Sequence, residues 1–402
     1  MRVAINGAGV AGPALAFWLR RSGHEVLLVE EAPAPRTGGY VIDFWGIGYD
    51  IADRMGLIPE IRRLGYQVKE VRFVGRRGHR SGGFKVAVFD RATGGRFTSL
   101  ARSDLAGTIV RALDPGVEVI YGDSIAAIDD RGDTVRLAFD HAPPREVDLV
   151  IGADGLHSRV RHLVFGDDGE REVSLGYHVA AFQVEGYRPR DELVYVSHGT
   201  PGRQISRFTL RGDRTMFLFV FHDECLPTPA PVTEAERRTA LCHIFADAGW
   251  EAPAVLDALM KADAVYFDRV SQIRMERWTK GRVALIGDAA ACVSLLAGEG
   301  TGLAITEAYV LAGELLRANG DHTIAFARYE ERLQPFLGRK QASAAKFASS
   351  FAPRTALGLA FRDAVTRLFG IGFLADRFVA ADLRDDVELP DYGFESAMSA
   401  SR

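Results

Sequence analysis

The chain has 402 residues, a formal net charge of −4 and 47% hydrophobic residues, which is the composition of an ordinary globular protein. The balanced charge leaves no broad basic surface, so nucleic acid is not expected as a partner. No apolar run approaches the roughly 18 residues that cross a bilayer, so stable membrane insertion is not expected either. The N-terminus lacks a signal-peptide pattern, and the three cysteines fit neither a disulfide framework nor a zinc site. We therefore expect a cytoplasmic protein that binds no metal.

The first 31 residues show the complete pattern of a nucleotide-binding unit. An apolar strand over 3–5 is followed by a glycine-rich turn, a helix over 13–21 and a second strand over 25–29. Glu30 ends that strand, where a carboxylate can accept hydrogen bonds from a ribose hydroxyl and disfavours a 2′-phosphate. A glycine turn framed in this way predicts a parallel sheet that binds a dinucleotide.

The turn itself has the spacing Gly7-x-Gly9-x-x-Gly12, with Val10 and Ala11 before the last glycine. Gly7 permits the tight turn, Gly9 lets the backbone approach a pyrophosphate, and Gly12 lets the helix pack closely on the strand. The free N–H groups and the positive dipole end of the helix then face the phosphates. This unit alone fits either an NAD-dependent dehydrogenase or a flavoprotein.

Two later segments distinguish between these classes. Residues 147–161 contain a buried strand that ends in Gly-Ala-Asp-Gly, with Asp154 in the loop. Residues 281–315 contain a strand that ends at Gly-Asp, followed by the glycine-rich turn 298–302 at the start of a long helix. The three motifs in this order resemble the class A flavoprotein monooxygenases, the para-hydroxybenzoate hydroxylase family. The single-component members, including the tetracycline-inactivating monooxygenases, are the nearest in size.

The resemblance implies an α/β fold: a GR2-type, Rossmann-like FAD-binding domain with an inserted, mostly antiparallel substrate sheet and C-terminal helices. It also implies non-covalent FAD, NADPH rather than NADH as the transient electron donor, and O2 as a co-substrate. Oxygen would add at flavin C4a, and the hydroperoxide would hydroxylate or epoxidise an aromatic or polyketide-like molecule. The expected division is 1–70, 98–172 and 276–340 for the FAD-binding domain, 71–97 and 173–275 for the substrate domain, and 341–402 for the C-terminal helical segment.

The sequence between the motifs fits this division. Alternation of apolar and polar residues over 70–98 predicts antiparallel strands around a turn, and strands dominate again over 174–221. Helices are predicted over 233–245 and 252–261. Nearly everything after Gly302 reads as helical.

The resemblance assigns roles in the cofactor site to particular residues. Arg102 lies in an LxRxxL segment and would bond pyrophosphate or ribitol oxygens. Asp288 lies at the end of a parallel strand and would bond a ribose or ribitol hydroxyl. The N–H groups at the start of the long helix would stabilise negative charge that builds at N1/O2 of the reduced flavin. The expected cofactor contacts are Gly7, Gly9, Val10, Ala11, Gly12, Glu30, Glu31, Arg36, Gly39, Tyr40, Arg102, Ile125, Asp154, Asp288, Gly298, Gly300, Thr301 and Gly302.

Departures from the family pattern concern the substrate rather than FAD. Ala291 stands where many relatives have histidine, and Ser294-Leu295 where they have proline. The proline-built face of the pocket is therefore expected to differ here. An apolar-rich segment over 341–374 is expected to cover the interface of the two domains. A membrane-surface helix is the alternative for that segment, but its polar face has few basic residues.

Metal-based and nucleophilic catalysis are not indicated. The histidines of the central region lack ligand spacing, and neither G-x-S-x-G nor H-E-x-x-H occurs. The chemistry then belongs to the cofactor. Two alternatives stay open: an FAD-dependent reductase or dehydrogenase on the same scaffold, and a flavin-binding sensor without turnover. A flavin halogenase is disfavoured because the W-x-W-x-I-P segment is absent.

The substrate pocket is the part that the sequence defines least. One face of the inserted sheet must face the flavin, and strand alternation restricts which residues share that face. Such a wall needs apolar bulk and a few polar groups that orient a planar molecule. We predict a large, mostly apolar pocket for an aromatic or polycyclic substrate, without the paired arginines that would clamp a small benzoate. The candidate lining residues are Tyr40, Phe44, Gln183, Arg207, Phe217, Phe219 and Phe221.

Overall fold

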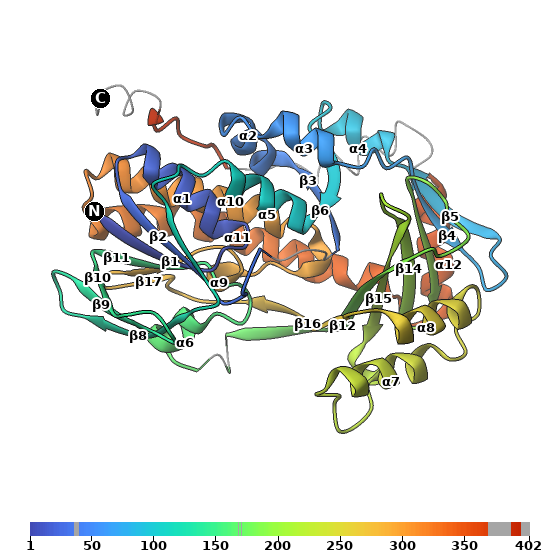
Figure 1. Ribbon diagram of the computed structural model, residues 1–402. Coiled ribbons are helices and arrows are strands. Elements are labelled where there is room, and N and C mark those ends of the chain that lie inside the picture. The colour runs from blue at the N-terminus through green and yellow to red at the C-terminus, as the bar shows by residue number, and fades with distance from the viewer. Residues whose placement is uncertain (36–39, 168, 170, 369–386, 395–402) are drawn as a thin grey trace.

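The structure is a computed structural model in which the chain forms two lobes (Figure 1). It describes residues 1–35, 40–167, 169, 171–368 and 387–394. Helices and strands are mixed along the chain, so the predicted α/β fold is confirmed. Among these residues, no helix combines the length and the apolar character that a membrane crossing requires.

The first lobe is built on a six-stranded sheet that begins at the N-terminus. Neighbouring strands run parallel except for an antiparallel pair at one edge. The central strands are short apolar runs buried on both faces, as a parallel sheet requires, and Val3, Ala4 and Ile5 are at most 1% exposed. In spatial order the strands are β17 (Thr279–Lys280), β18 (Val283–Leu285), β11 (Leu149–Gly152), β1 (Arg2–Asn6), β2 (Glu25–Glu30) and β7 (Glu118–Tyr121).

Helices cover one side of this sheet, and a small sheet with one helix covers the other (Figure 1). The helical side carries α1 (Ala11–Arg21), α5 (Arg102–Arg111) and α10 (Gly300–Arg317). The opposite side carries β8 (Ile125–Asp130), β9 (Val135–Phe139), β10 (Arg145–Val147) and α6 (Arg159–Phe165). Strand β1 therefore delivers its glycine turn directly to the N-terminus of α1, as the sequence pattern predicts.

The second lobe is built on a seven-stranded sheet. Only β13 and β4 pair in parallel, and every other neighbouring pair is antiparallel. In spatial order the strands are β16 (Tyr266–Ile273), β12 (Glu172–Glu185), β15 (Arg214–His222), β14 (Arg203–Thr209), β13 (Val194–Thr200), β4 (Glu70–Val74) and β5 (Arg80–Lys85). One face packs against α7 (Glu234–Phe245) and α8 (Ala252–Lys261), and α12 (Ala356–Leu368) lies on the other face.

The chain after β5 departs from the prediction of strands throughout 70–98. Helix α4 (Ala87–Ala92) follows β5, and the next strand, β6 (Phe97–Ala101), leaves the large sheet. It pairs antiparallel with β3 (Val41–Trp45) in a separate two-stranded ribbon. The apolar alternation before β6 is so short that the sequence pattern does not distinguish a strand from a short helix, and the prediction of a strand there is wrong.

The remaining helices connect the two lobes and brace the first. They are α2 (Gly46–Arg54), α3 (Ile58–Leu64), the short α9 (Asp288–Ala291) and the long α11 (His322–Phe351). Helix α11 contacts α10 in the first lobe and β12 in the second, so it spans the junction (Figure 1).

The last described stretch of the chain returns to the first lobe. Tyr392 and Phe394 join Trp18 and Tyr309 in an aromatic cluster, with ring centroids 4.7 Å apart for Trp18 and Phe394 and 5.2 Å apart for Tyr309 and Tyr392. A Cβ at Gly313 on α10 would collide with the Tyr392 ring. The glycine therefore makes the slot in which the tyrosine lies.

Candidate active site

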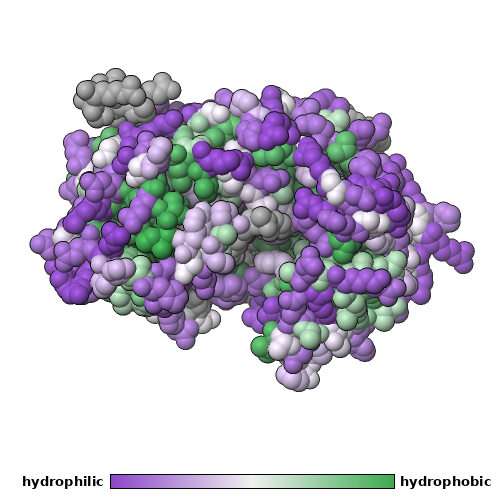
Figure 2. All heavy atoms as spheres, viewed as in Figure 1, coloured by the Kyte–Doolittle hydropathy of each residue, from purple (hydrophilic) through white to green (hydrophobic). Residues whose placement is uncertain are grey.

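A cavity of about 2390 Å³ lies between the lobes and is lined by residues of both large sheets. Figure 2 shows the surface indented between the lobe that holds β8–β10 and the lobe that holds α7 and α8. Pockets for one small ligand usually measure roughly 300–1,000 Å³. The cavity extends from the glycine turn after β1 to strands β4 and β5, so it has room for a dinucleotide and a second molecule.

The three glycines of the first motif have separate structural roles. Gly7 has a φ of +107°, and a Cβ there would collide with the Ala153 carbonyl oxygen of the neighbouring strand end. A Cβ at Gly12 would collide with the Gly7 carbonyl, which explains the close helix–strand packing. A Cβ at Gly9 would meet no atom within 4 Å and would point into open space at the cavity. The main chain at Gly9 is therefore accessible to a bulky phosphate.

Acidic side chains hold the surrounding loops. The Glu30 carboxylate accepts hydrogen bonds from the backbone N–H groups of Ala8, at 2.7 Å, and Ala32, at 3.0 Å. Asp154 accepts from Asn6 Nδ2 at 3.0 Å and from Ser158 Oγ at 2.5 Å. Both acids line the cavity, so each can shape its loop and still present a carboxylate edge to a sugar hydroxyl.

A cluster around Arg102 occupies the middle of the cavity. The Arg102 N–H donates to the Tyr40 carbonyl at 3.2 Å, and the Tyr40 and Tyr266 rings are 6.1 Å apart. Burial raises the pKa of the Tyr40 hydroxyl, and the neighbouring Arg102 partly opposes that shift. Burial, reinforced by the charge of Asp288, raises the pKa of Cys292 well above its usual value. Cys292 is therefore a neutral thiol rather than a nucleophile.

Asp288 and the start of α10 form the end of the cavity beside the first lobe. The preceding Gly287 has a φ of +63°, and its N–H donates to Glu307 Oε2 at 2.8 Å. Glu307 is 1% exposed, and burial raises its pKa to about 8. Its carboxyl also lies 3.1 Å from the Tyr329 hydroxyl. Glu307 thus holds the loop that presents Asp288. The sequence pattern did not indicate this role, because Glu307 is distant from the loop in the sequence.

Thirteen of the predicted cofactor contacts line the cavity: Gly7, Gly9, Val10, Ala11, Glu30, Glu31, Tyr40, Arg102, Asp154, Asp288, Gly298, Gly300 and Thr301. Three others lie outside it. Gly12 packs against the glycine turn, and Gly302 packs against Gly48 of α2. Ile125 is fully buried in the core, where its N–H bonds Asn6 Oδ1 at 3.1 Å. Arg36 and Gly39 lie outside the described residues.

Strand alternation decides which side chains of the second lobe reach the cavity. Gln183 on β12 lines it, as predicted, and so does Leu218 on the neighbouring β15. Phe217, Phe219 and Phe221 are 0% exposed on the opposite face, where they pack against α7 and α8. Their assignment to the pocket is therefore wrong. The two helices cover the more aromatic face, which leaves the mixed face for the cavity.

Arg207 and Phe44 are also misassigned. Arg207 lies on the face away from the cavity, where its guanidinium bonds Asp191 at 2.6 Å and Glu251 at 2.8 Å. It is a buried structural ion pair. Phe44 is 1% exposed in the core of the first lobe, with its ring centroid 5.8 Å from that of Tyr49.

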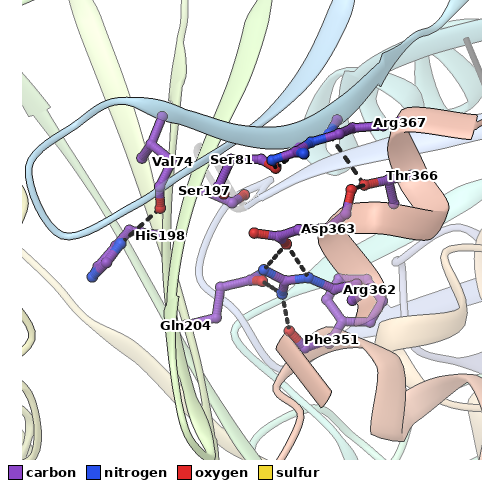
Figure 3. A network of polar contacts seen from close by, with 12 residues as sticks. Val74, Ser81, Ser197, His198, Gln204, Phe351, Arg362, Asp363, Thr366 and Arg367 are labelled. Carbon is purple, nitrogen blue, oxygen red and sulfur yellow. Dashed lines mark hydrogen bonds and ion pairs between the residues drawn. The ribbon is translucent and has the colours of Figure 1, made fainter. Parts of the chain in front are cut away.

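Helix α12 closes the outer end of the cavity (Figure 3). Arg362 donates to Gln204 Oε1 at 2.8 Å and pairs with Asp363 at 3.0 Å. The Gly83 N–H donates to Thr366 Oγ1 at 3.1 Å, so the helix is bonded to the main chain of β5. The predicted C-terminal segment thus contributes directly to the wall of the pocket.

Polar groups that are not among the predicted site residues also line the cavity. Asp268 accepts from the Tyr266 hydroxyl at 3.1 Å and lies 3.3 Å from His157 Nε2. The hydrogen bond with Asp268 raises the pKa of His157. Asp43, on β3, lines the cavity one residue before the misassigned Phe44.

The two-domain fold and the glycine-lined cavity define a dinucleotide-binding flavoprotein. The FAD-binding domain family matches residues 1–323. The chain is 38% identical to an uncharacterized protein of Mycobacterium tuberculosis over 84% of this chain and 91% of that relative. It is 34% identical to a flavin-dependent monooxygenase from an unknown prokaryotic organism, over 85% of this chain and 87% of that one.

A solved structure extends the similarity to the whole fold. The tetracycline destructase Tet(51) superposes with a TM-score of 0.82 and 31% identity, covering 97% of this chain and 99% of that chain. The protein therefore belongs to the FAD-binding domain family, among its FAD-dependent monooxygenases. It is an oxidoreductase that binds FAD.

Proposed function

We propose that the protein uses NADPH and O2 to insert one oxygen atom into an aromatic or polycyclic small molecule, by hydroxylation or epoxidation. The supporting observation is that one cavity joins the dinucleotide cradle to an apolar wall. Val71, Phe73 and Phe84 from the outer strands and Phe89 and Phe97 from the segment beyond them line that wall. When bound, FAD would supply the redox chemistry, namely hydride acceptance from the nicotinamide and activation of dioxygen.

The described residues fit FAD at three places. The open position at Gly9 would admit the pyrophosphate, Glu30 on the cavity wall would accept from a ribose hydroxyl, and the N-terminus of α10 adjoins Asp288. A Cβ built at Gly300 would lie 3.7 Å from Asp288 Oδ1, so this helix start and this carboxylate act on the same part of the ligand. The raised pKa of Cys292 disfavours thiolate attack, which supports non-covalent FAD.

The role of the remaining wall is to position the substrate and to exclude water. The aromatic side chains of β4, β5 and β6 remove the substrate face from solvent, and Gln183 offers an amide that can orient a polar substituent. The solved relative is named for tetracycline, a polycyclic molecule, so tetracycline is the first compound to test.

The test measures NADPH consumption, oxygen uptake and peroxide release by the FAD-loaded enzyme, with and without tetracycline and simpler polycyclic phenols. Consumption that rises with substrate, requires oxygen and yields an oxygenated product supports a monooxygenase of this substrate class. Oxygen-independent turnover would instead support the reductase alternative. Reduction of the flavin without turnover of any compound would support the sensor alternative.

The preference for NADPH rests on family resemblance. Stopped-flow reduction of the flavin by each nucleotide tests it, and a strong preference for NADH would overturn it. Acid precipitation of the protein should release the yellow cofactor into the supernatant, whereas colour that stays with the pellet would contradict non-covalent binding.

A further inference from the structure

The β3–β6 ribbon presents one acidic side chain to the cavity. Ile42 and Phe44 on β3 are 6% and 1% exposed, because they face the core of the first lobe. Side chains alternate along a strand, so Val41, Asp43 and Trp45 point the other way, and all three line the cavity. Asp43 is thus held by a rigid ribbon rather than by a mobile loop.

The Asp43 carboxyl has one protein partner. Ser99, directly opposite on β6, donates to Asp43 Oδ1 at 2.5 Å. Within the described part of the chain, no other hydrogen bond or ion pair reaches this carboxyl. The side chain is exposed only as part of the cavity lining, and its second oxygen is available there.

Four of the other acids that line the cavity already have protein partners. Asp268 is bonded by Tyr266 and lies beside His157, and Glu299 pairs with Lys340 at 3.0 Å. Asp154 and Glu30 accept backbone and side-chain hydrogen bonds from their own loops. Asp43 differs from these four acids because, among the described residues, Ser99 is its one hydrogen-bond partner and its second carboxyl oxygen faces the cavity.

Ser197, Ser206 and Tyr195 form a neutral part of the far wall. Ser197 and Ser206 hydrogen-bond each other at 2.8 Å, which satisfies both hydroxyls. Burial raises the pKa of Tyr195, and the charge of Asp43 adds to that shift, so the phenol stays neutral and near the acid. Burial likewise raises the pKa of Asp43 itself. A second anion placed beside the ionised Asp43 carboxylate would be repelled by it.

We propose that Asp43 is the substrate-anchoring residue of this pocket: it binds a hydroxyl or amine donor of the substrate and rejects substrates that carry a carboxylate. This inference rests on the proposed function and narrows its substrate class to polycyclic phenols, enols or amines. Ser99 orients the carboxyl, so that the oxygen facing the cavity accepts the substrate hydrogen bond.

The test uses three matched probes with the FAD-loaded enzyme: 2-naphthol, its methyl ether and 2-naphthoate. Binding is followed through the perturbation of the flavin absorbance, and turnover through NADPH and oxygen consumption. The variant is Asp43→Asn, which keeps an acceptor for Ser99 while removing the charge. The control is Asp50→Asn, which removes an exposed carboxylate on α2 that pairs with Arg96 outside the cavity.

The native enzyme and the Asp50→Asn control should bind 2-naphthol about 10-fold or more tightly than the ether, as expected for a hydrogen bond to a charged group, and should exclude 2-naphthoate. In Asp43→Asn the preference should fall to about 2-fold or less, and 2-naphthoate should begin to bind, while FAD affinity stays unchanged.

Retention of the native preference in Asp43→Asn would overturn the inference while leaving the proposed function intact. Loss of FAD affinity without a change in preference would also overturn it, because the carboxyl would then serve the flavin. Failure of all three probes to bind or to stimulate oxygen-dependent turnover in either protein would overturn the proposed substrate class and the inference with it.

Discussion

The two walls of the cavity are built by different means. On the nucleotide side the main chain forms the site, through the missing side chain at Gly9, the positive φ of Gly7 and the start of α10. On the side of the second lobe, side chains form the wall, and the packing of α7 and α8 selects which face they come from. A wall built from main chain leaves a fixed spacing of glycines in the sequence. A wall built from side chains leaves only an alternation of residues along each strand. That alternation does not show which of the two sheet faces lines the cavity.

Substitutions on opposite faces of the second sheet should separate these roles most strongly. Phe219→Ala should lower the free energy of unfolding by about 3–5 kcal/mol, because it opens a cavity in a fully buried cluster. Gln183→Ala should leave the unfolding free energy nearly unchanged while weakening substrate affinity. Denaturant unfolding, FAD content and KM measured for both variants check this. A reversal, with Phe219→Ala changing KM alone, would show that the cavity face has been assigned wrongly.

Two substitutions at Gly9 test whether the nucleotide wall depends on open space. Gly9→Glu should weaken FAD binding by about 100-fold, because a carboxylate would fill the phosphate position and repel the ligand. Gly9→Ala serves as the matched control and should fold normally with FAD affinity much nearer to the native value. Titration of the apoprotein with FAD, followed by flavin fluorescence, measures both. Native FAD affinity in Gly9→Glu would contradict the placement of the pyrophosphate.

A smaller effect is expected from Glu307, behind the nucleotide wall. Burial raises its pKa from 4.5 in the unfolded chain to about 8. The folded state therefore holds a proton that the unfolded state releases, and this contribution to stability is complete below about pH 4.5 and lost as the pH rises through 8. Glu307→Gln cannot ionise, so above pH 8 its melting temperature should exceed that of the native protein by about 2–4 °C.

The control for this prediction is Glu331→Gln on α11, an exposed carboxylate that should not change the pH dependence. Melting curves from pH 5.5 to 9 compare the three proteins. If the native protein and Glu307→Gln keep a constant difference across that range, burial does not raise the pKa of Glu307 in the folded state.

The sequence predicted the first lobe, and most of the cofactor residues that it proposed line the cavity, because a tight turn or a close approach of the main chain requires particular residue types. Gly7, Gly9, Asp154 and Asp288 lie at strand ends, and parallel strands bring such ends together at one edge. The face of the second sheet could not be predicted in the same way. Phe217, Phe219 and Phe221 suit a substrate pocket as well as they suit a helix-covered core. Arg207 was misread because its partners, Asp191 and Glu251, are distant in the sequence.

The Gly313–Tyr392 contact bears on how far the C-terminus can be shortened. A chain shortened after α12 would lose Tyr392 and Phe394, leaving the Trp18 and Tyr309 rings and an open slot above Gly313 facing solvent. Exposed aromatic surface of this kind favours self-association. Although this stretch lies on the first lobe, away from the substrate wall, shortened forms of the protein made for crystallisation or immobilisation should retain residues 387–394.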